Sequence, residues 1–244
     1  MKRSLVLISI AAVALWATGC QTIFAPPSAE AIFEKMEKAT DPGHKLPSMK
    51  TSVFTYNAES NNKEKSELVV SIKSPSQIRF EFKNAEGTDV IGYDGKTGWE
   101  YDPRCGMRTI AGKELEELKF QAVYLAPDSR IKDIFAKTML NGSEMVDGED
   151  CWKLTGYPLA DFKVQPVIIF ISKERSLLVK TIEQQNNIPD SAETVVTLFR
   201  NYKLLDGVMM PYTIVTESGD LVITSELTSV KWNPLLRNRL FAKP

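Results

Sequence analysis

The chain has 244 residues, 43% of them apolar and 25% charged, and its 30 basic residues nearly balance its 31 acidic ones. This balance lacks the strongly basic character of nucleic-acid-binding domains, so we expect no nucleic-acid partner. The apolar fraction is ordinary for a globular chain, and a length of this order suits one medium-sized domain.

The first residues predict a secretory signal that ends at a lipid-bearing cysteine. Lys2 and Arg3 precede an apolar stretch that is shorter than the about 20 residues a membrane-spanning helix needs. The following "ATGC" at 17–20 resembles the lipobox of bacterial lipoprotein signals, in which the Cys thiol receives a diacylglyceryl group. The sequence therefore predicts a signal peptide over 1–19, lipid attachment at Cys20 and a lipidated tether over 20–27. An ordinary soluble secreted protein is the alternative.

Location follows from the same segment. Two or more acyl chains anchor a protein stably to a membrane, so the N-terminal lipid makes the membrane an expected partner. Gln21 occupies the position where Asp favours inner-membrane retention in enterobacterial-type lipoproteins. We therefore expect the periplasmic face of the outer membrane in a bacterial cell envelope.

A helix and a group of strands come next. Ser28 is the expected N-cap of a helix that runs to about Ala39 and stops at Asp41-Pro42-Gly43. Strict alternation then predicts antiparallel strands with one apolar face. In "ELVVSIK" (67–73) that face carries Leu68, Val70 and Ile72, and in "QIRFEFK" (77–83) it carries Ile78, Phe80 and Phe82. After the turn Asp94-Gly95-Lys96, Trp99 and Tyr101 share one face of a further strand.

The middle of the chain changes to helical periodicity. Apolar residues predict one helix over 113–125 and, after Pro127, a second over 128–140. Six strands follow, at Cys151–Tyr157, Val164–Ser172, Leu177–Gln184, Ala192–Lys203, Met209–Glu217 and Leu221–Trp232. Four early strands, two helices and six late strands argue for an antiparallel α+β fold rather than βαβ units, in a single domain over 28–244.

Residues for common enzyme chemistry are sparse. His44, the chain's one histidine, lies in the Pro/Gly loop "DPGHKLP", which is a poor frame for a catalytic base. The histidine and cysteine spacing does not suit zinc, and "DGKTG" lacks the strand and helix that frame a phosphate loop. We therefore expect a non-enzymatic protein without metal or cofactor. Cys105 and Cys151 form either a disulfide or two buried free thiols.

Several motifs together resemble a known family. "VIGYDGKTGWEYDP" (90–103) follows a strand of the pattern K-x-P, and "LLDGVMMPYTIVT" (204–216) and the terminal "LFAKP" add to the likeness. These segments resemble the lipoprotein carrier and acceptor (LolA/LolB-like) family of outer-membrane lipoprotein sorting. The resemblance covers most of 28–244 and involves structural turns rather than catalytic signatures.

The resemblance implies a strongly curved, incompletely closed antiparallel β-sheet, a half-barrel whose apolar concave face is covered by helices and can hold acyl chains. The expected cavity or core lining is Leu68, Val70, Ile72, Ile78, Phe80, Phe82, Trp99 and Tyr101. Carriers place an arginine directly before the strand's proline, where this chain has Ser74 in "KSPSQ". This departure, with the lipidated Cys20, favours an anchored receiver of lipid or lipoprotein acyl chains over a diffusing carrier.

Two other functions stay open at this point. The same fold could serve as an envelope sensor or interaction module that binds a periplasmic protein partner. A hydrolase is the third reading, and it would require turnover that depends on His44.

Overall fold

The computed structural model describes residues 26–188 and 191–244, so the predicted signal peptide and Cys20 lie outside the described residues. The helices are α1 (Ala29–Thr40), α2 (Gly112–Tyr124) and α3 (Ile131–Ile134), with short 3-10 helices η1 (Leu46–Ser48) and η2 (Asn238–Leu240). The strands are β1 (Thr51–Ser60), β2 (Lys65–Lys73), β3 (Gln77–Asn84), β4 (Gly87–Tyr93), β5 (Gly98–Asp102), β6 (Gly106–Ile110), β7 (Phe135–Val146), β8 (Glu149–Pro158), β9 (Val167–Ser172), β10 (Leu178–Ile188), β11 (Ser191–Leu205), β12 (Val208–Ser218) and β13 (Leu221–Trp232).

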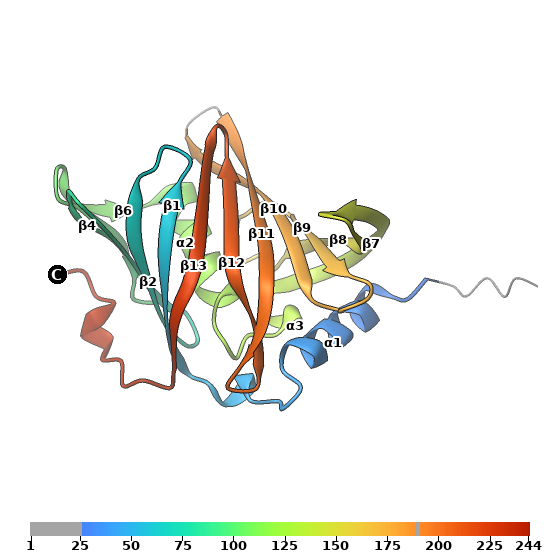
Figure 1. Ribbon diagram of the computed structural model, residues 1–244. Helices are drawn as coiled ribbons and strands as arrows, with labels where there is room; N and C mark the ends of the chain where they lie inside the picture. Colours follow the sequence, from blue (N-terminus) through green and yellow to red (C-terminus); the bar gives the residue numbers. More distant parts are fainter. Residues whose placement is uncertain (1–25, 189–190) are drawn as a thin grey trace, which may run out of the picture.

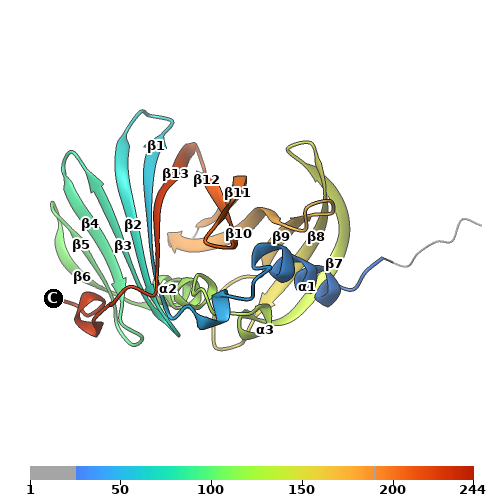
Figure 2. The ribbon, with the colours of Figure 1, turned by 60° about the horizontal axis from the view of Figure 1, so that its bottom comes forward.

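One antiparallel sheet contains all thirteen strands of the described residues, in the order β6-β5-β4-β3-β2-β1-β13-β12-β11-β10-β9-β8-β7. Two runs of sequential neighbours meet where β1 pairs with β13. The outermost strands β6 and β7 do not pair with each other, and the sheet curves strongly around helices α1 and α2 (Figures 1 and 2). The predicted fold class, an α+β half-barrel, is confirmed. We call β1–β6 the first wing and β7–β12 the second wing.

The helices lie inside the curve. α2 contacts β3 and β4 of the first wing and also β10 of the second, and α1 contacts both β7 and β12. A helix can touch strands so far apart in the sheet order only from the concave side, where Figure 2 shows both helices. The helices therefore cover part of the concave face, as the family resemblance implied.

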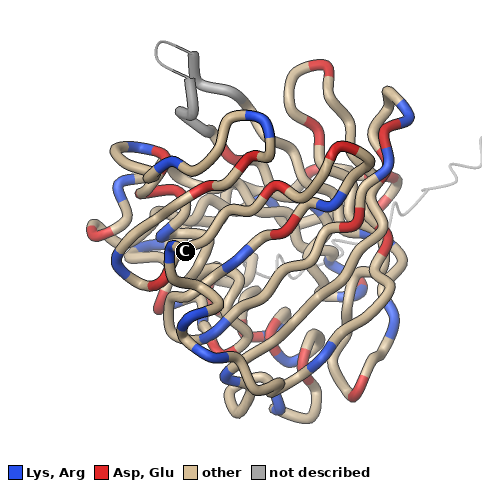
Figure 3. Tube along the Cα trace, turned by 90° about the vertical axis from the view of Figure 1, so that its left-hand side faces the viewer, with Lys and Arg blue, Asp and Glu red and all other residues tan. Residues whose placement is uncertain are grey.

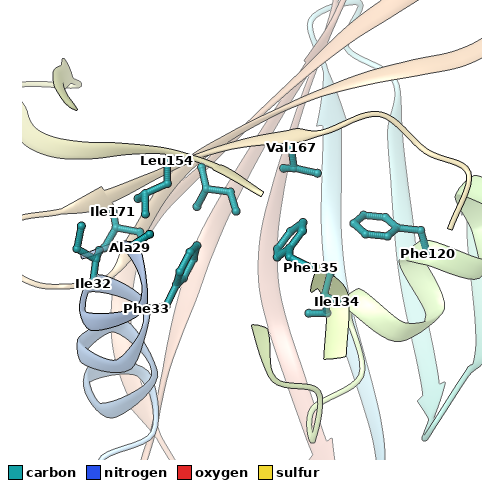
Figure 4. Close-up of a cluster of buried hydrophobic side chains, with 10 residues drawn as sticks. Ala29, Ile32, Phe33, Phe120, Ile134, Phe135, Leu154, Val167 and Ile171 are labelled. Atoms are coloured by element: carbon teal, nitrogen blue, oxygen red, sulfur yellow. The ribbon is translucent and has the colours of Figure 1, made fainter. Parts of the chain in front are cut away.

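Helix α1 forms as its sequence predicts. The Ser28 hydroxyl accepts a hydrogen bond from the Ala31 amide at 3.2 Å, which is the expected N-cap. Ile32 and Phe33 are buried, and they extend from α1 toward the sheet residue Leu154 in Figure 4. This cluster also takes in Phe120 of α2, so one apolar core joins both helices to the second wing.

Strand β9 of the second wing is buried on both of its faces. Along β9, Val167, Ile169 and Ile171 belong to the concave cluster under α1. Phe170, which points the other way, belongs to a second cluster on the convex face. The convex cluster consists of Val146, Cys151, Phe170, Val179, Leu198 and Val215. A strand buried on both faces has a continuous apolar sequence, which explains why "VIIFI" lacks alternation.

The predicted helix over 128–140 is wrong. Only the turn of α3, Ile131–Ile134, is helical, and the chain becomes the edge strand β7 at Phe135. Ile131, Ile134 and Phe135 have helical spacing, which is why the sequence predicted a helix there. Pairing with β8 supplies the backbone hydrogen bonds that the helix would have made.

Strands β1, β6 and β7 were not predicted. The second half of β1, "NAES" (57–60), has little strand propensity, and only its pairing with β2 and β13 stabilises it. Strand β6 has five residues, three of them exposed, so it carries no strong pattern.

Candidate functional site

Six of the eight predicted lining residues lie on the concave face of the first wing. Across β2 and β3, the register pairs Leu68 with Phe82, Val70 with Phe80 and Ile72 with Ile78. Directly opposed residues share a face of the sheet. Five of the six pack in one apolar cluster with Leu118 of α2, which lies on the concave side.

Exposure of this apolar face rises along the strands. Ile72 and Ile78 are 1% and 0% exposed in the cluster with α2. Farther along, Leu68, Phe80 and Phe82 are only half-buried, and the rings of Phe80 and Phe82 stack with centroids 6.4 Å apart. We call the half-buried set the concave floor, which consists of Leu68, Phe80, Phe82 and Ile91. It extends the buried cluster as an apolar surface that water reaches.

An ion-pair cluster fastens the first turn of α2 to the first wing. Arg108 of β6 donates to both carboxylate oxygens of Glu114, at 2.8 and 2.5 Å, and also pairs with Glu100 of β5. The hydrogen bond to Glu114 is the main cause that raises the pKa of Arg108. A bidentate arginine pair fixes geometry as well as charge, so this end of α2 is held on β5 and β6.

The loop after α2 is fastened to the same wing by Asp128. Its carboxylate accepts hydrogen bonds from the Lys50 amine at 2.6 Å and from the Ser74 hydroxyl. Burial alone would raise the pKa of Asp128, but these two hydrogen bonds outweigh burial and lower it. Ser74 occupies the position where family carriers have arginine, and here it holds this loop through its hydrogen bond to Asp128. No sequence signal pointed to Asp128.

Against the second wing, α2 faces the half-buried carboxylate of Glu183 instead. A crevice of about 20 Å³ separates α2 from β9 and β10. Its lining is Glu117, Phe120, Gln121, Val164, Gln165, Val167, Glu183 and Gln184. Burial, and then the charge of Glu117, raise the pKa of Glu183. The crevice has room for one water molecule, so an acyl chain does not fit there while α2 keeps its position.

Trp99 and Tyr101 share a face as predicted, but it is the convex face. Trp99 lies opposite Gly92, which in turn lies opposite the charged residue Arg79. Trp99 is 1% exposed because the C-terminal segment covers it, and its indole N–H donates to the carbonyl of Phe241 at 2.8 Å. Tyr101 is 40% exposed. The two residues therefore do not belong to the concave floor, because the turn between β4 and β5 sets the opposite phase.

Comparison with solved structures identifies the architecture. A DUF1329 family protein from Desulfovibrio piger matches with a TM-score of 0.59 and 14% identity, over 87% of this chain and 96% of that one. A LolA superfamily protein from Nitrosomonas europaea matches with a TM-score of 0.59 and 15% identity, over 89% and 99%. A Vibrio parahaemolyticus domain assigned to outer membrane lipoprotein sorting matches with a TM-score of 0.56 and 13% identity, over 86% and 94%.

The chain has the LolA-type fold. The resemblance read from the sequence motifs is thereby confirmed for the fold. No family model matches the sequence, and no curated protein matches it.

The cysteines of this LolA-type fold are not bonded. Cys105 is exposed in the turn between β5 and β6, and Cys151 is buried on β8. Of the two alternatives that the sequence left open, the disulfide does not form, because the strands of these two cysteines lie near opposite ends of the sheet order. Burial raises the pKa of the Cys151 thiol to about 11, so it stays protonated at neutral pH.

The side chains and helices of the described residues were compared with the requirements of metal sites and membrane spans. The described residues contain no group of three or more His, Cys, Asp or Glu side chains that could hold a metal ion. None of the helices in the described ranges has the length and apolar character to cross a membrane.

A groove of about 780 Å³ lies at the end of the β1–β2 hairpin. Its lining is mainly polar: Asn57, Ala58, Glu59, Ser60, Asn61, Lys63, Lys65, Ser66, Glu67, Lys83, Asn84, Val222, Thr224 and Glu226. Asn57, Glu67 and Lys83 lie opposite one another in the register, on the face away from the concave floor. This groove therefore does not suit an acyl chain.

Proposed function

We propose that the chain is a lipid-anchored protein of the bacterial cell envelope that binds lipid or lipoprotein acyl chains on its concave floor without catalysing a reaction. The carrying observation is the half-buried apolar surface of Leu68, Phe80, Phe82 and Ile91, which continues outward from the core under α2. Covering such a surface with hydrocarbon gains roughly 25 cal/mol per Å² of apolar area removed from water.

The floor suits an acyl chain better than the other recesses do. The crevice between α2 and the second wing is water-sized, and six of the fourteen residues that line the convex groove are charged. The floor itself is aliphatic and aromatic, which is the usual lining of a site for apolar ligands. Its ligand would therefore lie against β2, β3 and β4, or would displace α2 to reach deeper.

Lipidation of Cys20 and location at the outer membrane complete the proposal. They are supported by the lipobox-like "ATGC", by Gln21, and by the fold that this chain shares with a domain assigned to outer membrane lipoprotein sorting. We test the anchor with Cys20→Ser in a bacterial host, with the signal-peptidase inhibitor globomycin as a second arm. We expect loss of membrane association in the variant and accumulated precursor under globomycin. A variant that matures normally and stays at the membrane would refute the anchor.

Acyl-chain binding is tested with a pair of neighbouring substitutions. Leu68 points to the concave floor, and Val69, which is also half-buried, points to the convex face. Leu68→Asp places a carboxylate in the apolar site and should weaken binding by about tenfold or more. Val69→Asp makes the same chemical change on the other face and should leave binding within about twofold of the parent.

The measurement is a fluorescence titration with a dansylated fatty acid and a synthetic diacylated lipopeptide, on chains that start at Gln21. These chains keep every described element, since the elements begin at Ala29. Equal loss in both variants, or no binding by the parent, would contradict the proposal. Lipid in an organic extract of the purified parent, detected by mass spectrometry and depleted in Leu68→Asp, would support it independently.

A further inference from the structure

Three segments that are distant in sequence meet at one end of the molecule. The amine of Lys45 donates to the carbonyl of Asp206 at 2.5 Å, which joins the η1 region to the β11–β12 turn. The amide of Lys50 donates to Asn233 at 2.8 Å, which joins the same region to the C-terminal segment. We call the segments 43–50, 203–207 and 231–239 the basic end, and Figure 1 shows it at the bottom of the view.

The basic end has a charge that the rest of the chain does not share. Its basic residues are Lys45, Lys50, Lys203, Lys231, Arg237 and Arg239, and its one acidic residue is Asp206. Of these cations, Lys50 is paired with Asp128 from the loop after α2, which leaves five for a partner. The whole chain has 30 basic and 31 acidic residues, so the remainder is net negative. Within the described part of the chain, Lys231, Arg237 and Arg239 form no ion pair. Lys and Arg positions gather below the marked C-terminus in Figure 3.

Two leucines stand out of this basic surface. Leu235 is 89% exposed and Leu204 is 62% exposed, which are large values for apolar side chains. The backbone is held in place at both leucines. The Thr51 hydroxyl donates to the carbonyl before Leu235, the Lys73 amine donates to the carbonyl after it at 3.0 Å, and Leu204 lies in the pairing of β11 with β12. The fold therefore presents both leucines to solvent among cations.

We propose that the basic end docks on the surface of an anionic lipid bilayer. The cations would meet lipid phosphates, and Leu204 and Leu235 would enter the headgroup region, as in peripheral proteins that combine basic and apolar side chains. This orientation is the one in which charge and exposed apolar surface are satisfied together. An acidic soluble protein would complement the charge but would leave the separated leucines without a matching pocket.

The length of the N-terminal segment agrees with this orientation, and this step rests on the proposed lipid at Cys20. From Cys20 to Ala29 the chain can span at most about 30 Å. Helix α1 has 12 residues, hence a length of about 18 Å, and its C-terminal end leads directly into the basic end. The tether is long enough to return along α1, so a bilayer that holds the lipid can also contact the basic end.

The test measures co-sedimentation of chains starting at Gln21 with vesicles of phosphatidylcholine alone or mixed with phosphatidylglycerol. We expect binding to the anionic vesicles that weakens as salt is added. Each cation near an anionic surface contributes about fivefold to partitioning, so the double variant Arg237→Glu/Arg239→Glu should lose more than about tenfold. Leu235→Ser should lose about threefold to tenfold, because it removes apolar insertion.

The matched control reverses two lysines at the other end of the molecule. Lys63→Glu/Lys65→Glu makes the same change in net charge on the β1–β2 hairpin and should leave vesicle binding within about twofold. If both double variants lose vesicle binding equally, the loss depends only on the net charge of the protein and not on the basic end, and the proposal is overturned. Equal binding to neutral and anionic vesicles, no binding, or selective capture of an acidic protein instead of vesicles would overturn it as well.

The same variants separate this proposal from the acyl-binding function. Arg237→Glu/Arg239→Glu should bind the dansylated fatty acid as the parent does, and Leu68→Asp should bind anionic vesicles as the parent does. If the parent binds anionic vesicles but no fatty acid, only the acyl-binding function is refuted. If the parent binds the fatty acid but not the anionic vesicles, only the docking surface is refuted.

Discussion

In the first wing, β3 alternates apolar residues with polar or charged ones, whereas β9 in the second wing is apolar on both faces. The convex face of the first wing mixes charged residues such as Arg79 and Glu81 with the apolar Val69 and Val90, and the C-terminal segment covers Trp99. The convex face of the second wing carries its own apolar cluster, and the amines of Lys153 and Lys180 lie over the ring of Phe170. The apolar cluster of β2 and β3 in the first wing thus lies on the concave face, whereas β9 of the second wing packs into an apolar cluster on each of its faces.

Helix α2 lies between the two wings and is attached to them differently. To the first wing it is joined by the Arg108–Glu114 pair and by the hydrogen bonds of Asp128. Toward the second wing it brings Glu117 close to the half-buried Glu183. Phe120 of α2 also packs into the apolar core of the second wing, so we expect any displacement of α2 to begin at the two carboxylates and to widen the water-sized crevice beside them.

The largest expected effect tests whether the convex face of the first wing depends on the C-terminal segment. Trp99→Ala removes a fully buried indole and its hydrogen bond to Phe241, and should lower the free energy of unfolding by about 3 to 5 kcal/mol. Chemical denaturation measures the change. The control is Tyr101→Ala on the same strand and face, which should cost less than about 1 kcal/mol because Tyr101 is exposed. Similar costs for both would contradict the covering role of the C-terminal segment.

Trp99 and Tyr101 also show which features of the fold can be predicted from the sequence and which cannot. Alternation predicted that Trp99 and Tyr101 share a face, and it predicted the shared face of Leu68, Val70 and Ile72 correctly. Alternation within one strand does not reveal which face of the sheet a neighbouring strand's set will occupy, because the intervening turn sets the phase. The opposed pairing of Trp99 with Gly92 became visible only with the register.

The site was partly predictable for a related reason. Leu68, Phe80 and Phe82 follow from strand periodicity, a local property of the chain. Asp128 and Glu183 owe their roles to partners that the fold brings from distant segments, such as Ser74 and Glu117. The edge strand β7 was missed for the same cause, since its pairing with β8 outweighs the helical spacing at its start. Contacts between distant segments, rather than local patterns, decide these features.

An intermediate effect is expected at the attachment of α2 to the first wing. Asp128→Asn weakens the charged hydrogen bonds from Lys50 and Ser74, and should lower the free energy of unfolding by about 1 to 2 kcal/mol at neutral pH. The pKa of Asp128 is lowered in the folded state, so its contribution is present above the ordinary value of 3.8 and is lost as pH falls through the lower folded value. Parent and variant should therefore converge in acid.

Denaturation across this pH range measures the convergence, and Asp150→Asn provides a control in the second wing. Asp150 pairs with Lys173 at 2.9 Å, but its side chain is 57% exposed, so the control should cost less than about 0.5 kcal/mol. A loss for Asp128→Asn as small as that of the control would show that the first wing does not hold α2 through this carboxylate.

The smallest effect has the opposite sign and concerns α2 against the second wing. Burial, then the charge of Glu117, raise the pKa of Glu183 in the folded state, so its stabilising contribution is complete below the ordinary value of 4.5 and is lost as pH rises through the folded value. Glu183→Gln removes that loss and should raise the free energy of unfolding by about 1 kcal/mol at neutral pH, with no difference below pH 4.5. Glu174→Gln makes the same change at an exposed position and should have no effect at either pH. Amide hydrogen exchange in α2 should slow in Glu183→Gln at neutral pH only; unchanged exchange would mean that carboxylate repulsion does not loosen α2 from the second wing.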